Sequence, residues 1–160
     1  MAQTVVNVLL WFSALGCGLL AGLYFAFSTF IMTALGRIEL VHSVSAMNSI
    51  NATILRSLFM PVFVGTTLSG LALAIAALSH WGRPGAVLML AGGLIYVVGM
   101  FVVTMVCNVP LNNRLAAADP ANAETTSVWA RYLKEWTLWN HVRTISSLAA
   151  SAFFIAAITR

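Results

Sequence analysis

The first charged side chain in this chain is Arg37, and the residues before it are apolar or weakly polar. A helix rises about 1.5 Å per residue and the hydrocarbon core of a bilayer is about 30 Å thick, so roughly 20 apolar residues cross it. Four stretches meet or approach this length: residues 5–35, 58–78, 86–106 and 140–158. We therefore predict an all-α fold, a four-transmembrane-helix bundle that forms a single domain over residues 1–160.

Composition supports a membrane protein and argues against other classes. Hydrophobic residues make up 61% and charged residues 8% of the chain, whereas a soluble domain carries about 25% charged residues. The first apolar stretch is longer than the core of roughly 7–15 residues in a signal peptide, so we interpret it as a retained helix. No basic patch interleaved with aromatic residues is present, so nucleic acid is not an expected partner.

The basic residues are unevenly distributed between the two predicted sides of the membrane. With four spans, both termini and the second loop share one side, which holds Arg83 and Arg160. The other side, with the first and third loops and the nearby helix ends, holds the larger group: Arg37, Arg56, Arg114, Arg131, Lys134 and Arg143. Because cytoplasmic loops carry the excess of Lys and Arg, we predict cytoplasmic first and third loops and termini on the outer side.

The third predicted span runs into the sequence Asn108-Val109-Pro110-Leu111-Asn112. Pro110 has no backbone N–H and disfavours helical geometry in the residue before it, which frees nearby carbonyl groups. The amides of Asn108 and Asn112 either satisfy these carbonyls or turn toward a ligand. Beyond the third loop, a long amphipathic helix is predicted to begin near residue 124 or 127 and to continue unbroken into the fourth span.

One face of that long helix carries aromatic and hydrogen-bonding residues. At about 100° per residue, five side chains fall within about 80° of arc; they are Trp129, Tyr132, Trp136, Asn140 and Arg143. Such a face either lies in the aromatic belt at the membrane surface or lines an inward pocket. An arginine at the start of a span usually faces the bundle interior. We therefore favour an inward-facing pocket.

Two other segments offer candidate pocket residues. Tyr24 and Ser28 share a face near the end of the first span, where they either pack within the bundle or form one wall of a pocket. Asn48 and Asn51 share a face if the first loop contains a helix, and they are either solvated or turned toward the site. No spacing typical of a metal site joins the three histidines, so we predict neither a metal nor another cofactor.

Taken together, the segments Tyr24–Phe30, Asn108–Asn112 and Trp129–Arg143 resemble the anthrone oxygenase-like integral membrane family. The resemblance extends over essentially the whole chain. It implies a multi-pass protein of the bacterial inner membrane. It also implies O2 and a hydrophobic aromatic small molecule as partners alongside the lipid bilayer, because some relatives oxidise an anthrone to an anthraquinone with O2 and without metal or flavin. Formation of a homo-oligomer is left open.

The residues named above suggest roles in such a reaction. Aromatic side chains can stack on a planar ring, and Arg143 with asparagine donors can stabilise an enolate-type oxygen. The residues predicted to be catalytic are Arg143, Asn140, Asn108 and Tyr132. The residues predicted to bind substrate are Trp129, Trp136, Asn112, Tyr24, Ser28 and Asn51. The base is left open between His42, His141, Tyr132 and water.

Three functions fit these predictions. The first is a membrane-embedded, cofactor-free oxygenase or oxidase of an anthrone- or phenol-like substrate. The second is a carrier or binding protein for an anionic aromatic molecule. The third is an accessory membrane subunit without catalysis, whose Trp-rich face stays exposed until a partner binds.

Overall fold

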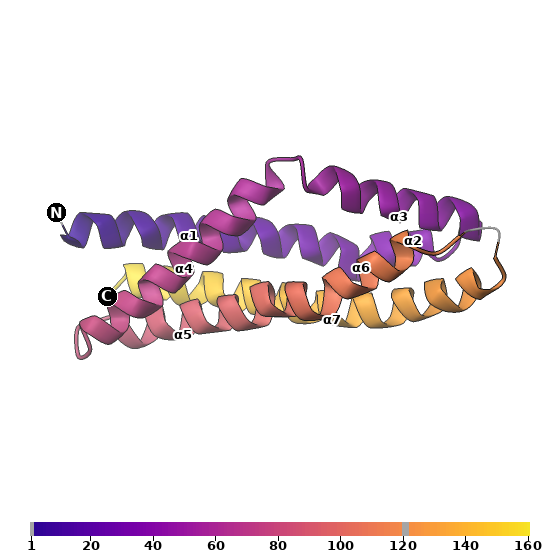
Figure 1. Ribbon diagram of the computed structural model, residues 1–160. Helices are drawn as coiled ribbons and strands as arrows, with labels where there is room; N and C mark the ends of the chain where they lie inside the picture. The colour runs from indigo at the N-terminus through magenta and orange to yellow at the C-terminus, as the bar shows by residue number, and fades with distance from the viewer. Residues whose placement is uncertain (1, 120–121) are drawn as a thin grey trace.

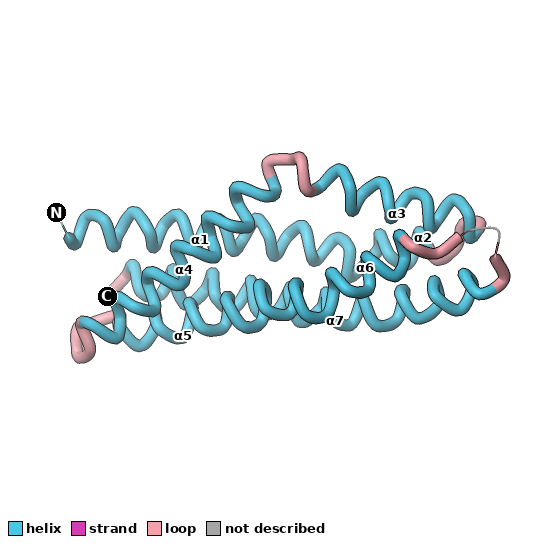
Figure 2. Tube along the Cα trace, in the orientation of Figure 1, coloured by secondary structure: helices cyan, strands magenta, loops and turns pink. Residues whose placement is uncertain are grey.

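A computed structural model describes residues 2–119 and 122–160, and within these residues the chain is helical with no strand. The predicted all-α bundle is confirmed (Figures 1 and 2). The elements are α1 (Ala2–Ala26), η1 (Phe27–Ile31), α2 (Met32–Leu35), α3 (Leu40–Ile54), α4 (Phe59–Ser79), α5 (Ala86–Tyr96), η2 (Val97–Val102), η3 (Thr104–Asn108), α6 (Val109–Ala116) and α7 (Glu124–Ile158). The three η segments are π-helical.

Four continuous helices in the described part of the chain are long and apolar enough to cross a membrane, as expected of a multi-pass membrane protein. They are Gln3–Leu35, Phe59–Ser79, Ala86–Ala116 and Glu124–Ile158. The last runs without interruption from the third loop into the fourth span, as predicted. The first loop contains a helix of its own, α3.

The third helix continues to Ala116, well beyond its predicted end at residue 106. Pro110 stands near the start of α6, immediately after the π-helical segment η3. A proline ring clashes with the carbonyl four residues earlier in a regular α-helix, here that of Val106. The wider π-helical turn around Val106 accommodates the ring, so the helix bends past the proline instead of ending.

The two ends of the bundle differ. Both termini and the α4–α5 turn lie at one end, while α3, α6 and the start of α7 lie at the other (Figure 1). The cytoplasmic location of this second end stays a prediction. The helix α4 has 21 residues, about the thickness of the hydrocarbon core. The first span and α7 have 33 and 35 residues, so they extend past the start of α4 at the second end.

Close helix contacts hold the membrane part together. A Cβ atom added at Gly93 in α5 would lie 2.5 Å from the Gly70 carbonyl oxygen and 2.8 Å from Ala74 Cβ in α4. Small residues at such interfaces allow the close backbone approach that stabilises helix pairs in lipid. Ser13 and Ser69 add a buried hydrogen bond of 2.7 Å between α1 and α4. The glycine at position 93 therefore sets the distance between α4 and α5.

Gly93→Ala is expected to destabilise the protein by about 1–3 kcal/mol, because the added methyl group overpacks the α4–α5 interface. Thermal unfolding in detergent measures the effect. Gly22→Ala is the matched control, since a Cβ at Gly22 meets nothing within 4 Å and alanine favours the helix. Equal losses of melting temperature in the two variants would contradict the proposed role of the close contact.

Candidate functional site

A cavity of about 520 Å³ lies inside the bundle, between α1, η1, α3, α4, η3, α6 and α7. Its volume falls within the range of roughly 300–1,000 Å³ typical of small-molecule sites. Most of its wall is apolar. The polar side chains in the wall are Asn48, Asn51, Thr104, Asn112, Asn113 and Arg143, with the tyrosine Tyr24. We call this space the interior cavity.

Among the described residues, Arg143 is the only cationic side chain that lines the interior cavity, and it is only 5% exposed. Its Nη2 donates to Asn140 Oδ1 at 2.6 Å, and its Nη1 makes a longer contact of 3.5 Å to Thr104 Oγ1. The guanidinium carbon lies 4.5 Å from the centroid of the Tyr24 ring and 5.0 Å from that of Trp136. The guanidinium is thus fixed by one short hydrogen bond and two aromatic faces.

Among the described residues, no carboxylate lines the interior cavity to balance this charge. The ion pairs that join Glu39 to His42 and Arg131 to Glu135 do not involve Arg143. The Nε atom of Arg143 is buried without a hydrogen-bond partner. A buried charge without a counterion is costly, and within a membrane bundle it usually marks a functional site. The arrangement suits an anionic ligand.

Asn140 fixes Arg143 to the first helix. It is fully buried, and its Nδ2 donates to the Tyr24 carbonyl and to Ser28 Oγ, both at 2.7 Å. Its Oδ1 accepts from Arg143, so the amide orientation follows from its three neighbours. Neither Asn140 nor Ser28 lines the interior cavity. Seen from the cavity, Asn140 and Ser28 lie behind Arg143 and hold its side chain in position.

The aromatic face of α7 turns into the bundle, as predicted, because Trp129, Tyr132 and Trp136 are all buried. The rings stack on one another: the centroids of Trp129 and Tyr132 lie 5.6 Å apart, and those of Tyr132 and Trp136 lie 5.7 Å apart. Only Trp136 lines the interior cavity. The buried stack gives no support to docking of a partner subunit on these rings.

The predicted asparagines occupy different places. Asn108 is buried behind the cavity wall, where its Nδ2 donates to the Trp136 carbonyl at 3.2 Å and its Oδ1 has no partner. Asn51 and Asn112 line the cavity. Both bind the hydroxyl of Tyr132, which donates to Asn112 Oδ1 at 2.8 Å and receives Asn51 Nδ2 at 3.4 Å. These two asparagines join α3 and α6 to α7.

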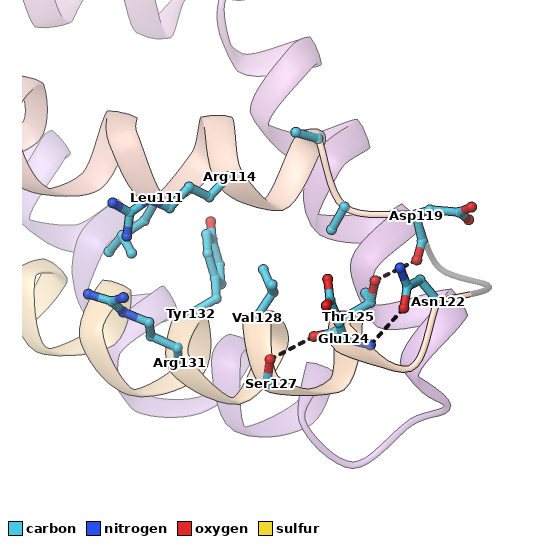
Figure 3. Close-up of a pocket in the computed structure, with 12 residues that line it drawn as sticks. Leu111, Arg114, Asp119, Asn122, Glu124, Thr125, Ser127, Val128, Arg131 and Tyr132 are labelled. Carbon is cyan, nitrogen blue, oxygen red and sulfur yellow. Dashed lines mark hydrogen bonds between the residues drawn. The ribbon is translucent and has the colours of Figure 1, made fainter.

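A second, polar cavity of about 550 Å³ lies at the end of the bundle near the third loop. Figure 3 shows Tyr132 between Arg114 and Arg131 in this cavity, with its hydroxyl pointing toward α6. Because Tyr132 lines the polar cavity while Asn51 and Asn112 line the interior one, their hydrogen bonds form a wall between the two spaces. We call this group of three residues the Tyr132 wall.

The structure therefore brings half of the predicted site residues to the interior cavity. Those that line it are Tyr24, Asn51, Asn112, Trp136 and Arg143. Those that contact these residues from behind are Asn108, Tyr132 and Asn140. One step farther out, Ser28 accepts a hydrogen bond from Asn140 and Trp129 stacks on Tyr132. Thr104 lines the cavity beside Arg143, and sequence reasoning missed it. Its four-residue spacing from Asn108, one helical turn, is the signal that was available.

The interior cavity has few groups able to accept or release a proton. Arg143 and Tyr24 are the ionisable side chains in its wall, and the Tyr24 hydroxyl contacts Met100 Sδ at 3.5 Å. The candidate bases His42 and His141 are exposed and do not line the cavity. Within the described residues, no group of three or more His, Cys, Asp and Glu side chains comes together that could hold a metal ion. The wall can hold an anion and a flat apolar body.

Comparison with known proteins places the chain in a family. The family model for anthrone oxygenase matches residues 52–153, which is more than half of the chain. The match contains α4, the whole third helix and α7 as far as residue 153 within the fourth span, and these elements supply Thr104, Asn112, Trp136 and Arg143 to the interior cavity. No curated protein and no solved structure matches the chain. The chain belongs to the anthrone oxygenase family.

Proposed function

We propose that this protein is a membrane-embedded, cofactor-free oxygenase of a hydrophobic aromatic substrate, anthrone- or phenol-like, that uses O2. The observation that carries the proposal is the buried Arg143, which lines an otherwise mostly apolar cavity without a carboxylate partner. An acidic aromatic compound has the two features that this cavity is suited to hold, an apolar ring system and an ionisable oxygen. Its ring system fills the apolar space, and its oxygen, once ionised, balances the guanidinium.

The reaction follows from that placement. The substrate loses a proton from its ring methylene or hydroxyl group, and the resulting enolate-type oxygen binds Arg143. The electron-rich anion transfers an electron to O2, and recombination forms a carbon–oxygen bond to a peroxide. Loss of water from the protonated peroxide converts the methylene to a carbonyl. One atom of O2 then resides in the product and the other in water, so the overall change needs no added reductant.

The residues contribute mainly through position and electrostatics. Arg143 stabilises charge that develops on the oxygen, an effect strengthened by the mostly apolar wall of the interior cavity. Trp136 presents the one ring of the aromatic stack that faces the cavity, beside Phe59 from α4 and Phe27 from η1. Asn140 holds the guanidinium against these rings through its 2.6 Å hydrogen bond. Asn112, which also lines the cavity, offers the substrate a further polar contact.

The proton must leave without a carboxylate or imidazole in the cavity wall, because none lines it among the described residues. We infer that the substrate is acidic enough to ionise with water as the acceptor, once Arg143 stabilises its anion. An opposite charge within about 4–6 Å lowers the pKa of an acid by roughly 1–3 units. The protein therefore selects substrates partly by their acidity, because a compound that does not ionise beside Arg143 does not react.

The second candidate function is a carrier or binding protein for an anionic aromatic molecule. The scarcity of proton-transfer groups in the wall favours it, since a cavity that only holds an anion needs no base. The two functions share Arg143 and differ in turnover.

Oxygen consumption by the purified, EDTA-treated protein in lipid nanodiscs tests the proposal. With an anthrone substrate, we expect uptake of one O2 for each anthraquinone formed, at a rate proportional to protein concentration. Empty nanodiscs and heat-denatured protein control for the spontaneous oxidation of the substrate. Tight binding of anthrone without uptake above these controls would replace the oxygenase by the carrier.

A further inference from the structure

The exposed part of the interior cavity's wall lies on two facing segments of the chain. Most lining residues are buried or half-buried, and the exposed ones come from the end of α3 with the residue after it, and from η3 with α6. They are Ala52, Leu55, Met105, Asn113 and Ala116. We call the gap between these two segments the lateral mouth.

The lateral mouth lies at the edge of the membrane's hydrocarbon core. The helix α4 has 21 residues, so it spans the core of about 30 Å with almost nothing to spare. Its start at Phe59 therefore marks one edge of the core. Leu55 lies in the short loop between α3 and α4, just before this start. Figure 2 shows that the chain turns a corner at this loop. We therefore expect the end of the mouth near Leu55 to lie at the interface between hydrocarbon and headgroups, and the end near Asn113 to lie farther from the core.

Apolar side chains surround the mouth on its membrane side. Leu55 is 63% exposed and Met105 is 48% exposed. Their neighbours Leu58 and Val106 are 84% and 65% exposed. Exposed apolar residues grouped in this way mark a surface that contacts lipid or an apolar ligand. On the side away from the core, Asn113 gives the rim a polar element.

The Tyr132 wall closes the route from the polar cavity into the interior cavity. In this wall, the Tyr132 hydroxyl contacts Asn112 at 2.8 Å and Asn51 at 3.4 Å. Opening this route would break hydrogen bonds to both α3 and α6 and displace a ring stacked on both sides. The lateral mouth requires no such change.

We propose that the ligand of Arg143 enters from the bilayer through the lateral mouth. Its substrate class is accordingly an amphipathic aromatic phenol or enol that partitions into the membrane interface. Such a molecule approaches with its rings against Leu55 and Met105. Its oxygen then points inward and reaches Arg143. The chemistry assigned to the ligand rests on the proposed function, whereas the route rests on the cavity alone.

Association kinetics test the route without turnover. The probe is a hydroxyanthraquinone dye, which is already oxidised at the reacting carbon, and its binding in nanodiscs is followed by stopped-flow absorbance. Narrowing the mouth with Ala52→Phe and Ala116→Phe is expected to slow association about tenfold or more. Dissociation should slow by the same factor and leave Kd unchanged, because a constriction affects passage and not the bound state.

The matched control is Ala117→Phe, the next residue of the chain, which lines the polar cavity instead. It is expected to leave both rate constants unchanged. Slower association in Ala117→Phe with no change in the mouth variants would overturn the proposal and place entry at the polar cavity. A weaker Kd with unchanged association in the mouth variants would also overturn it, since those residues would then shape the bound state. A lack of O2 uptake alongside slowed dye exchange would reject the oxygenase and retain the route.

Discussion

Replacing Arg143 with glutamine is expected to lower kcat/KM for substrate-dependent O2 uptake by about 100- to 1,000-fold, the usual cost of removing one stabilising donor from a developing oxyanion. The loss should be large because, of the residues that the structure describes, Arg143 is the only cation in the wall of the interior cavity, so none of the others there can replace its charge. Binding of the ionised dye should weaken together with activity. Both are measured in nanodiscs on the same protein preparation.

Two variants make this test specific. Arg131→Gln removes an exposed arginine of the same helix that pairs with Glu135 outside the interior cavity, and it should leave activity unchanged. Arg143→Lys keeps the charge but loses the planar group that lies over the Tyr24 and Trp136 rings, so partial activity is expected. Full activity in Arg143→Gln would remove the residue from the site and with it the main support for the oxygenase.

Much of the fold follows from hydropathy, because a membrane leaves helices as nearly the only option for four long apolar stretches. The course of the third helix, in contrast, does not follow from hydropathy. Pro110 is locally a helix-breaking signal, yet the helix continues to Ala116. The π-helical segment η3, which accommodates the proline, packs against α7, and a tertiary contact of this kind leaves no clear pattern in the sequence.

The candidate site, like the fold, could be predicted from the sequence only in part. Counting about 100° per residue grouped the aromatic residues of α7 on one face with Arg143, and the arginine correctly indicated that this face turns inward. The spacing of three and four residues that puts Trp129, Tyr132 and Trp136 on one face also brings their rings into contact with each other. Each ring therefore covers one face of its neighbour. Of the three rings, only that of Trp136 lines the interior cavity. The cavity itself depends on the corner between α3 and α4, a long-range feature that periodicity cannot reveal.

Thr104→Asp is expected to reduce binding of the ionised dye and O2 uptake by about 100-fold or more, because a like charge placed beside a bound anion costs several kcal/mol. Thr104 lines the interior cavity, and its Oγ1 lies 3.5 Å from Arg143 Nη1. A carboxylate at this position would pair with the guanidinium inside the protein. The binding site would then hold its own counterion, and the substrate anion would have to displace it.

The matched control is Thr104→Asn, which has nearly the shape of aspartate and no charge, and it should retain most of the binding. Melting temperatures of the two variants separate a charge effect from damage to the fold. Since the carboxylate also relieves an unpaired buried arginine, Thr104→Asp should be at least as stable as Thr104→Asn while binding far less dye. Equal dye binding by the two variants would mean that the ligand of this cavity is not held as an anion. In that case the unpaired Arg143 would serve the packing of α7 against Tyr24 and Asn140 instead of a reaction.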